Sequence, residues 1–307
     1  MEPPLNAASS PWFVGFTEQR LQAGEVHLRV RTGGRPDGPP LVLLHGFPQT
    51  HVMWQRVAQE LADDFALVLP DLRGYGDSDR PPGGPDHAAY SKRAMAADVH
   101  ALMQHLGHTR YAVCGHDRGG RVAHRLALDQ PQAVTRMCLI DIAPTLDMYA
   151  ATDMTFARAY YHWFHLIQPA PLPETMIGGN AREYLHAKLG GWGTGGLAHL
   201  EPQALAEYER CFCRPEAIHS ACEDYRAAAG IDLAHDQASR ERGERIACEL
   251  LLLWGERGVV HRLFDPLALW RAQCSAQVQG QAMPAGHFIP EELPGPTAQA
   301  LQDFLLP

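Results

Sequence analysis

The heptapeptide Gly-His-Asp-Arg-Gly-Gly-Arg at residues 115–121 constrains the fold of this 307-residue chain more than any other feature. It follows an apolar run, Tyr-Ala-Val-Cys at residues 111–114, and precedes a helical pattern that extends to Gln130. A strand that turns sharply into a helix needs small residues beside the turn, because the central side chain is forced out over the sheet. The sequence therefore predicts a strand, a glycine-flanked turn and a helix, with the Asp117 carboxylate exposed at the corner.

Asp117 has two interpretations. An aspartate before a helix is a common N-cap, and patterns of the type G-x-x-x-G also arise by chance. If the residue is instead a nucleophile, its chemistry differs from that of the serine often found at such turns. A serine attacks a carbonyl carbon and forms an acyl-enzyme, whereas an aspartate displaces a leaving group at saturated carbon and forms an ester. The second interpretation favours dehalogenases and epoxide hydrolases over esterases.

Short apolar runs alternate with helical patterns along most of the chain. The runs predicted to be strands are Pro40–Leu44, Phe65–Leu69, Tyr111–Cys114, Met137–Ile142, Leu250–Trp254 and a weaker one at Val278–Met283. A leading hairpin is predicted at Thr17–Leu21 and Val26–Thr32, and helices at 52–62, 91–106, 119–130 and 297–305. This alternation predicts an α/β fold whose mostly parallel, eight-stranded sheet is flanked by helices.

The alternation breaks between about Tyr149 and Ile231. This segment is rich in aromatic residues, His, Gly and Pro, and it has helical patches but no convincing buried strand. The patches lie at Phe156–Leu166, Ala181–Leu189 and Gln203–Cys211. An insertion after the sixth strand would lie above the carboxyl ends of the sheet, where α/β proteins bind ligands. We therefore expect a core domain at residues 1–148 and 232–307 and a helical cap domain at residues 149–231.

Charge and cysteine content exclude several classes of function. The formal net charge of −9 argues against nucleic acid or an anionic membrane as a partner. No apolar run is long enough to span a membrane, and the start Met-Glu-Pro-Pro lacks the features of a signal peptide. Seven cysteines at irregular spacings suggest reduced thiols and no zinc site. We expect a cytoplasmic protein that needs no metal and no organic cofactor.

Further catalytic groups occur where a hydrolase of this architecture would carry them. His287 lies in a Pro-Ala-Gly-His-Phe loop between the last strand and the final helix, and the chain order Asp, acid, His is that of such hydrolases. Asp141 ends the sixth strand, and a carboxylate buried there needs a partner. His287 is the obvious one, although Glu256 after the seventh strand is a weaker alternative acid. The backbone N–H groups of Phe47 and Arg118 are candidates for an oxyanion hole.

From about Phe13 to its end the chain resembles the α/β-hydrolase superfamily, and in its details the fluoroacetate and haloacetate dehalogenases. The resemblance rests on six segments: His45–His51, Asp117–Arg121, Asp141–Thr145, Tyr161–Trp163, Gln168–Pro173 and Cys222–Arg226. It implies that Asp117 is the nucleophile, that His287 and Asp141 activate water, and that Arg118 and Arg121 bind the substrate carboxylate. It further implies a halide site made by His162, Trp163 and Tyr225, with Trp192 at the pocket mouth. A homodimer is implied by the family alone, and Gly120 departs from the family's alanine.

The residue types support these roles. Arg118 and Arg121 are three residues apart at the start of a helix, so they lie on one face beside the positive end of its dipole. Two guanidinium groups suit a carboxylate, which predicts a small anionic 2-haloacid as the substrate. By periodicity alone, His162 and Trp163 fit an aromatic stripe of a packed helix better than a ligand site. His, Trp and Tyr can nevertheless each donate a hydrogen bond from an apolar body to a departing halide.

The expected reaction hydrolyses fluoroacetate or chloroacetate to glycolate and halide through an ester on Asp117. Pocket residues near Ile142, Trp192 and Val259 would influence which halide is cleaved. One alternative is an epoxide hydrolase with the same nucleophile, for which five tyrosines are available as acids: Tyr160, Tyr161, Tyr184, Tyr208 and Tyr225. Two arginines suit a neutral epoxide poorly. The other alternative is a non-catalytic ligand-binding protein, which would lack a member of the catalytic set.

Overall fold

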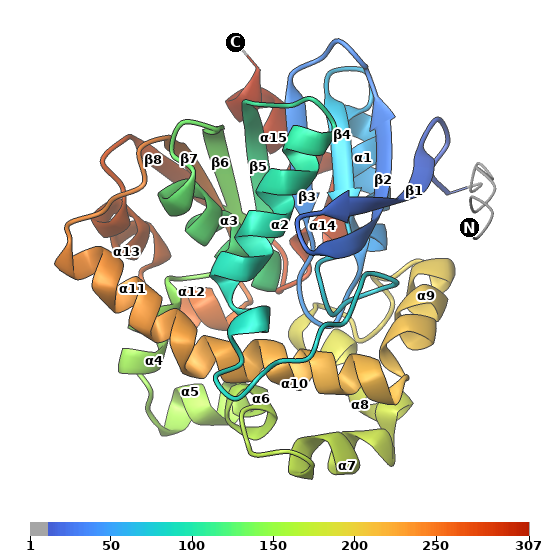
Figure 1. The fold of residues 1–307 in the computed structure, drawn as a ribbon, viewed down its shortest axis with the longest axis vertical. Coiled ribbons are helices and arrows are strands. Elements are labelled where there is room, and N and C mark those ends of the chain that lie inside the picture. Colours follow the sequence, from blue (N-terminus) through green and yellow to red (C-terminus); the bar gives the residue numbers. More distant parts are fainter. Residues whose placement is uncertain (1–11, 307) are drawn as a thin grey trace.

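A computed structural model describes residues 12–306, and its centre is one eight-stranded sheet (Figure 1). The strands are β1 Thr17–Ala23, β2 Val26–Gly34, β3 Pro40–Leu44, β4 Ala66–Pro70, β5 Tyr111–His116, β6 Val134–Ile140, β7 Glu249–Gly255 and β8 Val278–Met283. Their order across the sheet is β1-β2-β4-β3-β5-β6-β7-β8. β2 pairs antiparallel with β1 and β4, and every later neighbour pair is parallel. The predicted fold class is confirmed.

The central strands are apolar because helices cover both faces of the sheet. All six residues of β5 and all five of β4 are buried. On one face α2 (Lys92–His105) packs against α3 (Arg118–Asp129), and on the other α1 (Gln55–Leu61) packs against α15 (Pro294–Leu305), as Figure 1 shows. The predicted helix at 52–62 is divided into a 3-10 turn, η1 (His51–Trp54), followed by α1.

A run of helices separates β6 from β7, and we call it the helical insertion. It comprises α4 Thr145–Ala150, α5 Met154–Ala159, α6 Tyr161–Leu166, α7 Leu172–Gly178, α8 Ala181–Trp192, α9 Pro202–Phe212, α10 Pro215–Ala229 and α11 Ile231–Glu241. Figure 1 shows these helices gathered on one side of the sheet, with α10 running across it. Five short elements complete the described chain: η1, η2 Ala88–Tyr90, α12 Val259–Leu263, α13 Pro266–Gln273 and α14 Ile289–Glu292.

Helix α10 was missed by periodicity for a physical reason. Eleven of its residues are buried, and they include Glu223, Asp224 and Arg226. A helix that buries charged side chains has no clean apolar stripe, so the usual 3.6-residue signal is absent. The sixth strand also differs from expectation, because it begins at Val134, three residues earlier than predicted. It ends at Ile140, because Asp141 has a φ of 52° and leaves the sheet. Among the described helices, none has the length and apolar content needed to span a bilayer.

Candidate active site

The turn between β5 and α3 is tight, as the sequence predicts. Asp117 has φ of 46° and ψ of −115°, a conformation that side-chain-bearing residues rarely adopt. A Cβ on Gly115 would come within 2.4 Å of the Gly119 carbonyl oxygen, and one on Gly119 within 2.4 Å of the Leu44 oxygen. The glycines therefore let the turn close on itself and let α3 approach β3. The Asp117 side chain makes no capping hydrogen bond to α3, so the N-cap interpretation does not describe this turn.

The Asp117 carboxylate is buried between a backbone donor and a histidine. The Phe47 N–H donates to its Oδ1 at 2.9 Å, and the His287 Nε2 lies 3.9 Å from its Oδ2. Burial by itself raises the pKa of this carboxyl. The charges of His287, His116, Arg121 and Arg118 outweigh burial and hold the pKa below its ordinary value. Asp117 is thus kept as a carboxylate, the form that a nucleophile requires.

His287 is held by Asp141. The His287 Nδ1 lies 2.6 Å from Asp141 Oδ2, while the other carboxylate oxygen accepts the Gly255 N–H at 3.0 Å. Burial lowers the pKa of His287, but the hydrogen bond and charge of Asp141 outweigh burial and raise the pKa above its ordinary value. Glu256, the alternative acid, is exposed at the end of β7. The geometry brings together a carboxylate, an imidazole and an orienting acid.

Arg118 is tied to the helical insertion. Its Nε and Nη2 donate to the two carboxylate oxygens of Asp224 on α10 at 3.0 and 2.6 Å, and Nη2 also reaches the Asp224 carbonyl at 2.9 Å. The guanidinium carbon lies 4.2 Å from the centroid of the Tyr225 ring. The third nitrogen, Nη1, is buried and has no hydrogen-bond partner within the described chain. The Nη1 group of Arg118 is therefore available to donate hydrogen bonds to a ligand.

Arg121 differs from Arg118 because no carboxylate pairs with it in the described residues. Its Nη1 donates to the Ala143 carbonyl at 3.1 Å and to the Thr145 hydroxyl at 2.8 Å, and its Nη2 contacts the Met148 sulfur at 3.3 Å. The buried Nε has no hydrogen-bond partner among residues 12–306. Only 4% of the residue is exposed. The charge of Asp117 acts on this cation from a distance, but burial outweighs it and lowers the pKa of Arg121. A buried arginine without a direct ion pair is costly, so an additional anion would stabilise it.

Three aromatic side chains of the insertion pack beside the two arginines. His162 and Trp163 come from α6 and Tyr225 from α10, and all three are buried. The His162 ring centroid lies 5.6 Å from that of Tyr225, and Trp163 packs 4.8 Å from the Arg121 guanidinium carbon. Burial lowers the pKa of His162 well below its ordinary value, aided by the charge of Lys188, so the ring is neutral. Its Nδ1 has no partner within residues 12–306.

Trp192 and Ile142 complete the predicted set. The Trp192 ring lies 4.5 Å from His162 and 5.7 Å from His287, measured between centroids. Ile142 is buried, and a Cβ on Gly120 would come within 2.7 Å of its Cδ1. Glycine at position 120, where the resembled family has alanine, therefore leaves room for Ile142.

Two residues that support the site were missed by sequence reasoning. Asp224 orders Arg118 and also accepts the Tyr75 hydroxyl at 2.6 Å and the Lys92 ammonium. His116 Nε2 lies 2.8 Å from the His287 carbonyl oxygen, and burial together with the charge of His287 lowers the pKa of His116 to about 3. The signal for Asp224 was an acid inside a segment already singled out, Cys222–Arg226. No sequence pattern reveals that His116 touches a loop 171 positions away.

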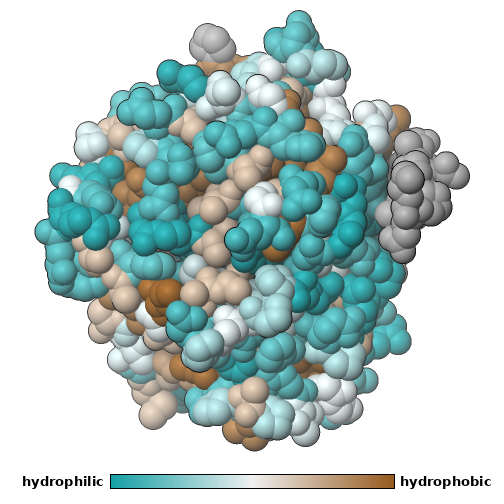
Figure 2. Space-filling model, in the orientation of Figure 1, coloured by the Kyte–Doolittle hydropathy of each residue, from teal (hydrophilic) through white to brown (hydrophobic). Residues whose placement is uncertain are grey.

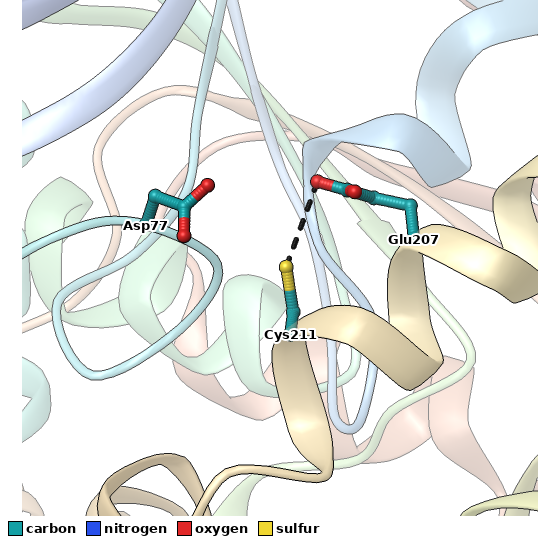
Figure 3. Close-up of side chains that lie close together, drawn as sticks. All are labelled: Asp77, Glu207 and Cys211. Carbon is teal, nitrogen blue, oxygen red and sulfur yellow. Dashed lines mark hydrogen bonds between the residues drawn. The ribbon is translucent and has the colours of Figure 1, made fainter.

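A second cluster of potential ligand atoms lies where α9 meets the core. Figure 3 shows Asp77, Glu207 and Cys211 together, with the thiol of Cys211 directed at Glu207. Arginines neutralise both carboxylates: Arg29 lies 2.6 Å from Glu207, and Arg210 lies 2.5 Å from Asp77. Burial raises the pKa of the Cys211 thiol, which keeps it protonated. The cluster is an ion-paired contact between insertion and core and gives no support for a cation site.

Comparisons with known proteins identify the family of this chain. The family model described as "alpha/beta hydrolase fold" matches residues 39–179. Fluoroacetate dehalogenase of Burkholderia sp is 43% identical over 95% of this chain and 95% of the relative. Soluble epoxide hydrolase of Corynebacterium sp. strain C12 is 34% identical over 84% of this chain and 86% of the relative. A solved structure from Nostoc sp PCC 7120, provisionally assigned as an α/β hydrolase, is 52% identical and has a TM-score of 0.93, covering 96% of this chain and 99% of that one.

Proposed function

This chain belongs to the α/β-hydrolase family, in the group that includes fluoroacetate dehalogenase, and from that membership and its site we propose that it is a haloacetate dehalogenase. The resemblance seen in the sequence is confirmed. The enzyme is a hydrolase of carbon–halogen bonds, and its substrates are small 2-haloacids such as fluoroacetate or chloroacetate.

The observation that carries this proposal is the excess of positive charge beside Asp117, because two arginines face one nucleophile carboxylate and Arg121 makes no ion pair within the described residues. Arg121 is buried with no carboxylate partner in the described residues, and the Nη1 of Arg118 is unused. A substrate carboxylate would accept hydrogen bonds from both arginines and supply the missing negative charge. It would also place the adjacent carbon near the nucleophile. The net charge of −9 opposes an anion only at long range, because salt screens charges beyond about 8 Å.

In the first half of the reaction, an oxygen of Asp117 attacks the halogen-bearing carbon in line with the departing halide. A carbon–oxygen bond forms, the carbon–halogen bond breaks, and the halide takes the electron pair. His162, Trp163 and Tyr225 can donate hydrogen bonds to the developing anion from N–H and O–H groups. The product of this half is a carboxymethyl ester of Asp117.

In the second half, water hydrolyses the ester. His287 accepts a proton from the water, with Asp141 holding the ring and stabilising its charged form. The hydroxide attacks the carbonyl carbon of Asp117. The oxyanion that develops there lies beside the Phe47 N–H, which already contacts the carboxylate at 2.9 Å; the Arg118 backbone N–H is the second donor we propose. When the intermediate collapses, the bond between the Asp117 carbonyl carbon and the glycolate oxygen breaks, and that oxygen takes the proton held by His287. Asp117 then releases its remaining proton to solvent and is again a carboxylate.

Two measurements test this function. Fluoride or chloride release should follow addition of fluoroacetate or chloroacetate, while styrene oxide should stay intact. A single turnover in heavy-oxygen water should place the label in Asp117, because water attacks the enzyme carboxylate. Label appearing directly in the first glycolate would contradict the ester mechanism.

An epoxide hydrolase is the second candidate, favoured by the 34% identity to the soluble epoxide hydrolase. Tyr225 is a possible acid for ring opening, and Tyr160 is likewise buried near His162. The buried Arg121 charge disfavours this candidate, because a neutral epoxide does not compensate it. Turnover of styrene oxide without turnover of haloacetates would establish it.

We also propose the domain division, the location and the assembly. Residues 149–231 act as a cap domain over a core at residues 1–148 and 232–307, of which residues 1–11 lie outside the described chain. All seven cysteines are free, which supports the reducing cytoplasm as the location. No metal or organic cofactor enters the steps above. We also propose the homodimer that the family implies.

A further inference from the structure

The loop that carries His287 is fastened by three consecutive backbone N–H groups. The N–H groups of Gly286 and Phe288 both donate to Glu292, at 2.9 Å to Oε2 and 3.0 Å to Oε1. The N–H between them, that of His287, donates to the Trp192 carbonyl at 2.8 Å. Every backbone donor from 286 to 288 therefore has a defined acceptor, and two of the three acceptors are oxygens of one carboxylate.

Glu292 also reaches the helical insertion. Its Oε2 accepts the Thr194 N–H at 3.2 Å and the Thr194 hydroxyl. Thr194 lies two residues after Trp192, and a Cβ on Gly286 would come within 2.5 Å of the Trp192 carbonyl oxygen. The segment 192–194 and the loop 286–288 thus share one carboxylate. That segment begins with the residue whose ring packs on both His162 and His287.

We propose that Glu292 is a positioning residue for His287, which holds the imidazole in reach of the water that hydrolyses the Asp117 ester. This inference rests on the proposed function. Glu292 touches neither substrate nor reacting atoms in the steps above; it acts through the backbone on either side of the base. Its carboxylate is needed because each oxygen accepts at least one backbone N–H. A glutamine has the same size, but its NH₂ group replaces one of the two carboxylate oxygens and cannot accept a hydrogen bond from the backbone N–H that it faces.

The role predicts an effect on one half of the reaction. Attack by Asp117 does not use His287, whereas ester hydrolysis does. In Glu292→Gln, chloroacetate should therefore give a rapid burst of about one chloride per active site, followed by steady release slowed about 10–100-fold by misplacement of the base. Chloroacetate is chosen because chloride leaves more readily than fluoride, so the ester forms quickly. Intact-protein mass should show the accumulated carboxymethyl ester.

The matched control is Thr194→Val, which removes only the hydroxyl contact and leaves the Gly286 and Phe288 bonds. Its steady chloride release should stay within about twofold of the wild-type rate. The inference is overturned if Glu292→Gln slows the first turnover as much as later ones, or turns over within about twofold of the wild-type rate. If Glu292→Gln does not fold, Glu292→Asp replaces it as the test variant, because aspartate keeps both carboxylate oxygens but its side chain is one carbon shorter. Glu292→Asp should then show the same burst. A time course of Glu292→Asp that matches the wild type also overturns the inference.

The wild-type chain separates this inference from the function on which it rests. Absence of chloride release by the folded wild-type protein would overturn the haloacetate dehalogenase assignment, and the role of Glu292 with it. Wild-type turnover beside an unaffected Glu292→Gln variant would overturn the role of Glu292 alone.

Discussion

At the scale of single residues, the two arginines of the site have different environments. Arg118 is paired with Asp224 through two hydrogen bonds to its carboxylate, whereas the polar partners of Arg121 among residues 12–306 are a carbonyl, a hydroxyl and a thioether. From the sequence, both were expected to bind the substrate carboxylate in the same way. In the folded protein they are not equivalent, because Arg118 forms an ion pair with a carboxylate of the protein and Arg121 forms none within the described residues. Under the proposed function, Arg121 is the arginine that the substrate carboxylate would pair with.

This difference predicts that Arg121→Met and Arg118→Met separate activity from stability. Each should lower kcat/KM for chloroacetate by at least about 100-fold, because each removes charge-assisted hydrogen bonds to the substrate carboxylate. Arg121→Met should keep or raise the melting temperature, since it removes an unpaired buried cation. Arg118→Met should lower the free energy of unfolding by about 3–5 kcal/mol, since Asp224 loses a buried ion-pair partner. Equal melting temperatures for the two variants, measured by calorimetry, would contradict this account.

The Asp141–His287 pair predicts a change in the pH profile of ester hydrolysis. His287 must be neutral to accept a proton, so the rate rises with pH through its pKa, which Asp141 raises by hydrogen bond and charge despite burial. In Asp141→Asn the pKa of His287 should fall, and the acid limb should move to lower pH. The plateau rate should drop by about 10³–10⁴-fold because the ring loses its orientation.

Glu256→Gln is the matched control for Asp141→Asn, because Glu256 is the other acid considered for this role. Both its acid limb and its plateau should be unchanged. An acid limb that moves in Glu256→Gln instead would transfer the orienting role to that residue.

At the scale of elements, α14 joins the core to α9 of the insertion through a buried acid. Glu291 accepts the Tyr208 hydroxyl at 2.7 Å and the Gln49 amide at 2.5 Å. The hydrogen bonds from Tyr208 and Gln49 lower the pKa of this carboxyl, but burial has the larger effect and raises the pKa to about 8. Two elements far apart in sequence therefore meet at a group that holds a proton near neutral pH.

This raised pKa predicts the sign of a pH effect on stability. Between pH of about 4.5 and about 8 the folded state keeps a proton that the unfolded chain has released. The free energy of unfolding should therefore fall as pH rises through that window. In Glu291→Gln the free energy of unfolding should fall less with pH, because a neutral amide has no proton to lose. The new side-chain N–H can donate to the buried Oε1 of Gln49 once the Gln49 amide is flipped. Urea unfolding at pH 5, 7 and 9 checks this, with the exposed Glu60→Gln expected to keep the wild-type slope.

The close approach of α3 to β3 gives a second prediction at this scale. In Gly119→Ala the new methyl would lie 2.4 Å from the Leu44 carbonyl oxygen, so backbone must move. The cost should be about 1–3 kcal/mol of unfolding free energy, together with displacement of Asp117 and loss of turnover. Gly191→Ala, in open space on α8, should instead be neutral or slightly stabilising. Chemical denaturation of both variants distinguishes a packing effect from a general intolerance of alanine.

At the scale of the whole molecule, exposed apolar side chains gather on the helical insertion. Four of the five large hydrophobic residues that are exposed within the described chain belong to it: Met154, Tyr161, Leu172 and Met176. Figure 2 shows hydrophobic surface on the side of the molecule where Figure 1 places the insertion. Apolar surface of this kind is a common feature of protein–protein contacts.

The homodimer proposal predicts a solution mass twice that of one chain. If α7 contributes to the contact, Leu172→Glu combined with Met176→Glu should give the monomer mass in light scattering or sedimentation. Val14→Glu, which charges the fifth exposed residue on the core, should leave the mass unchanged. A wild-type chain that sediments as a monomer across the concentration range would end the dimer proposal.

The sequence by itself determined the order of elements and the kinds of chemistry available. Buried strands appear as apolar runs, and the glycine-flanked Asp117 turn is local, so both can be recognised without knowing what they pack against. The sheet, the alternation and the family followed from such local signals. Helix α10 did not, because its buried charges remove the periodic pattern that marks a helix.

Only the tertiary structure decided how the groups are paired. The Asp141–His287 contact joins residues 146 positions apart, and the Arg118–Asp224 pair joins residues 106 apart. Nothing local distinguishes Arg118 from Arg121, or Glu292 from any other glutamate near a helix end. The distinction arises when packing removes water and leaves each buried charge with, or without, a partner. At this site, the chain supplied the charged groups, and folding determined which of them remain free to bind a substrate.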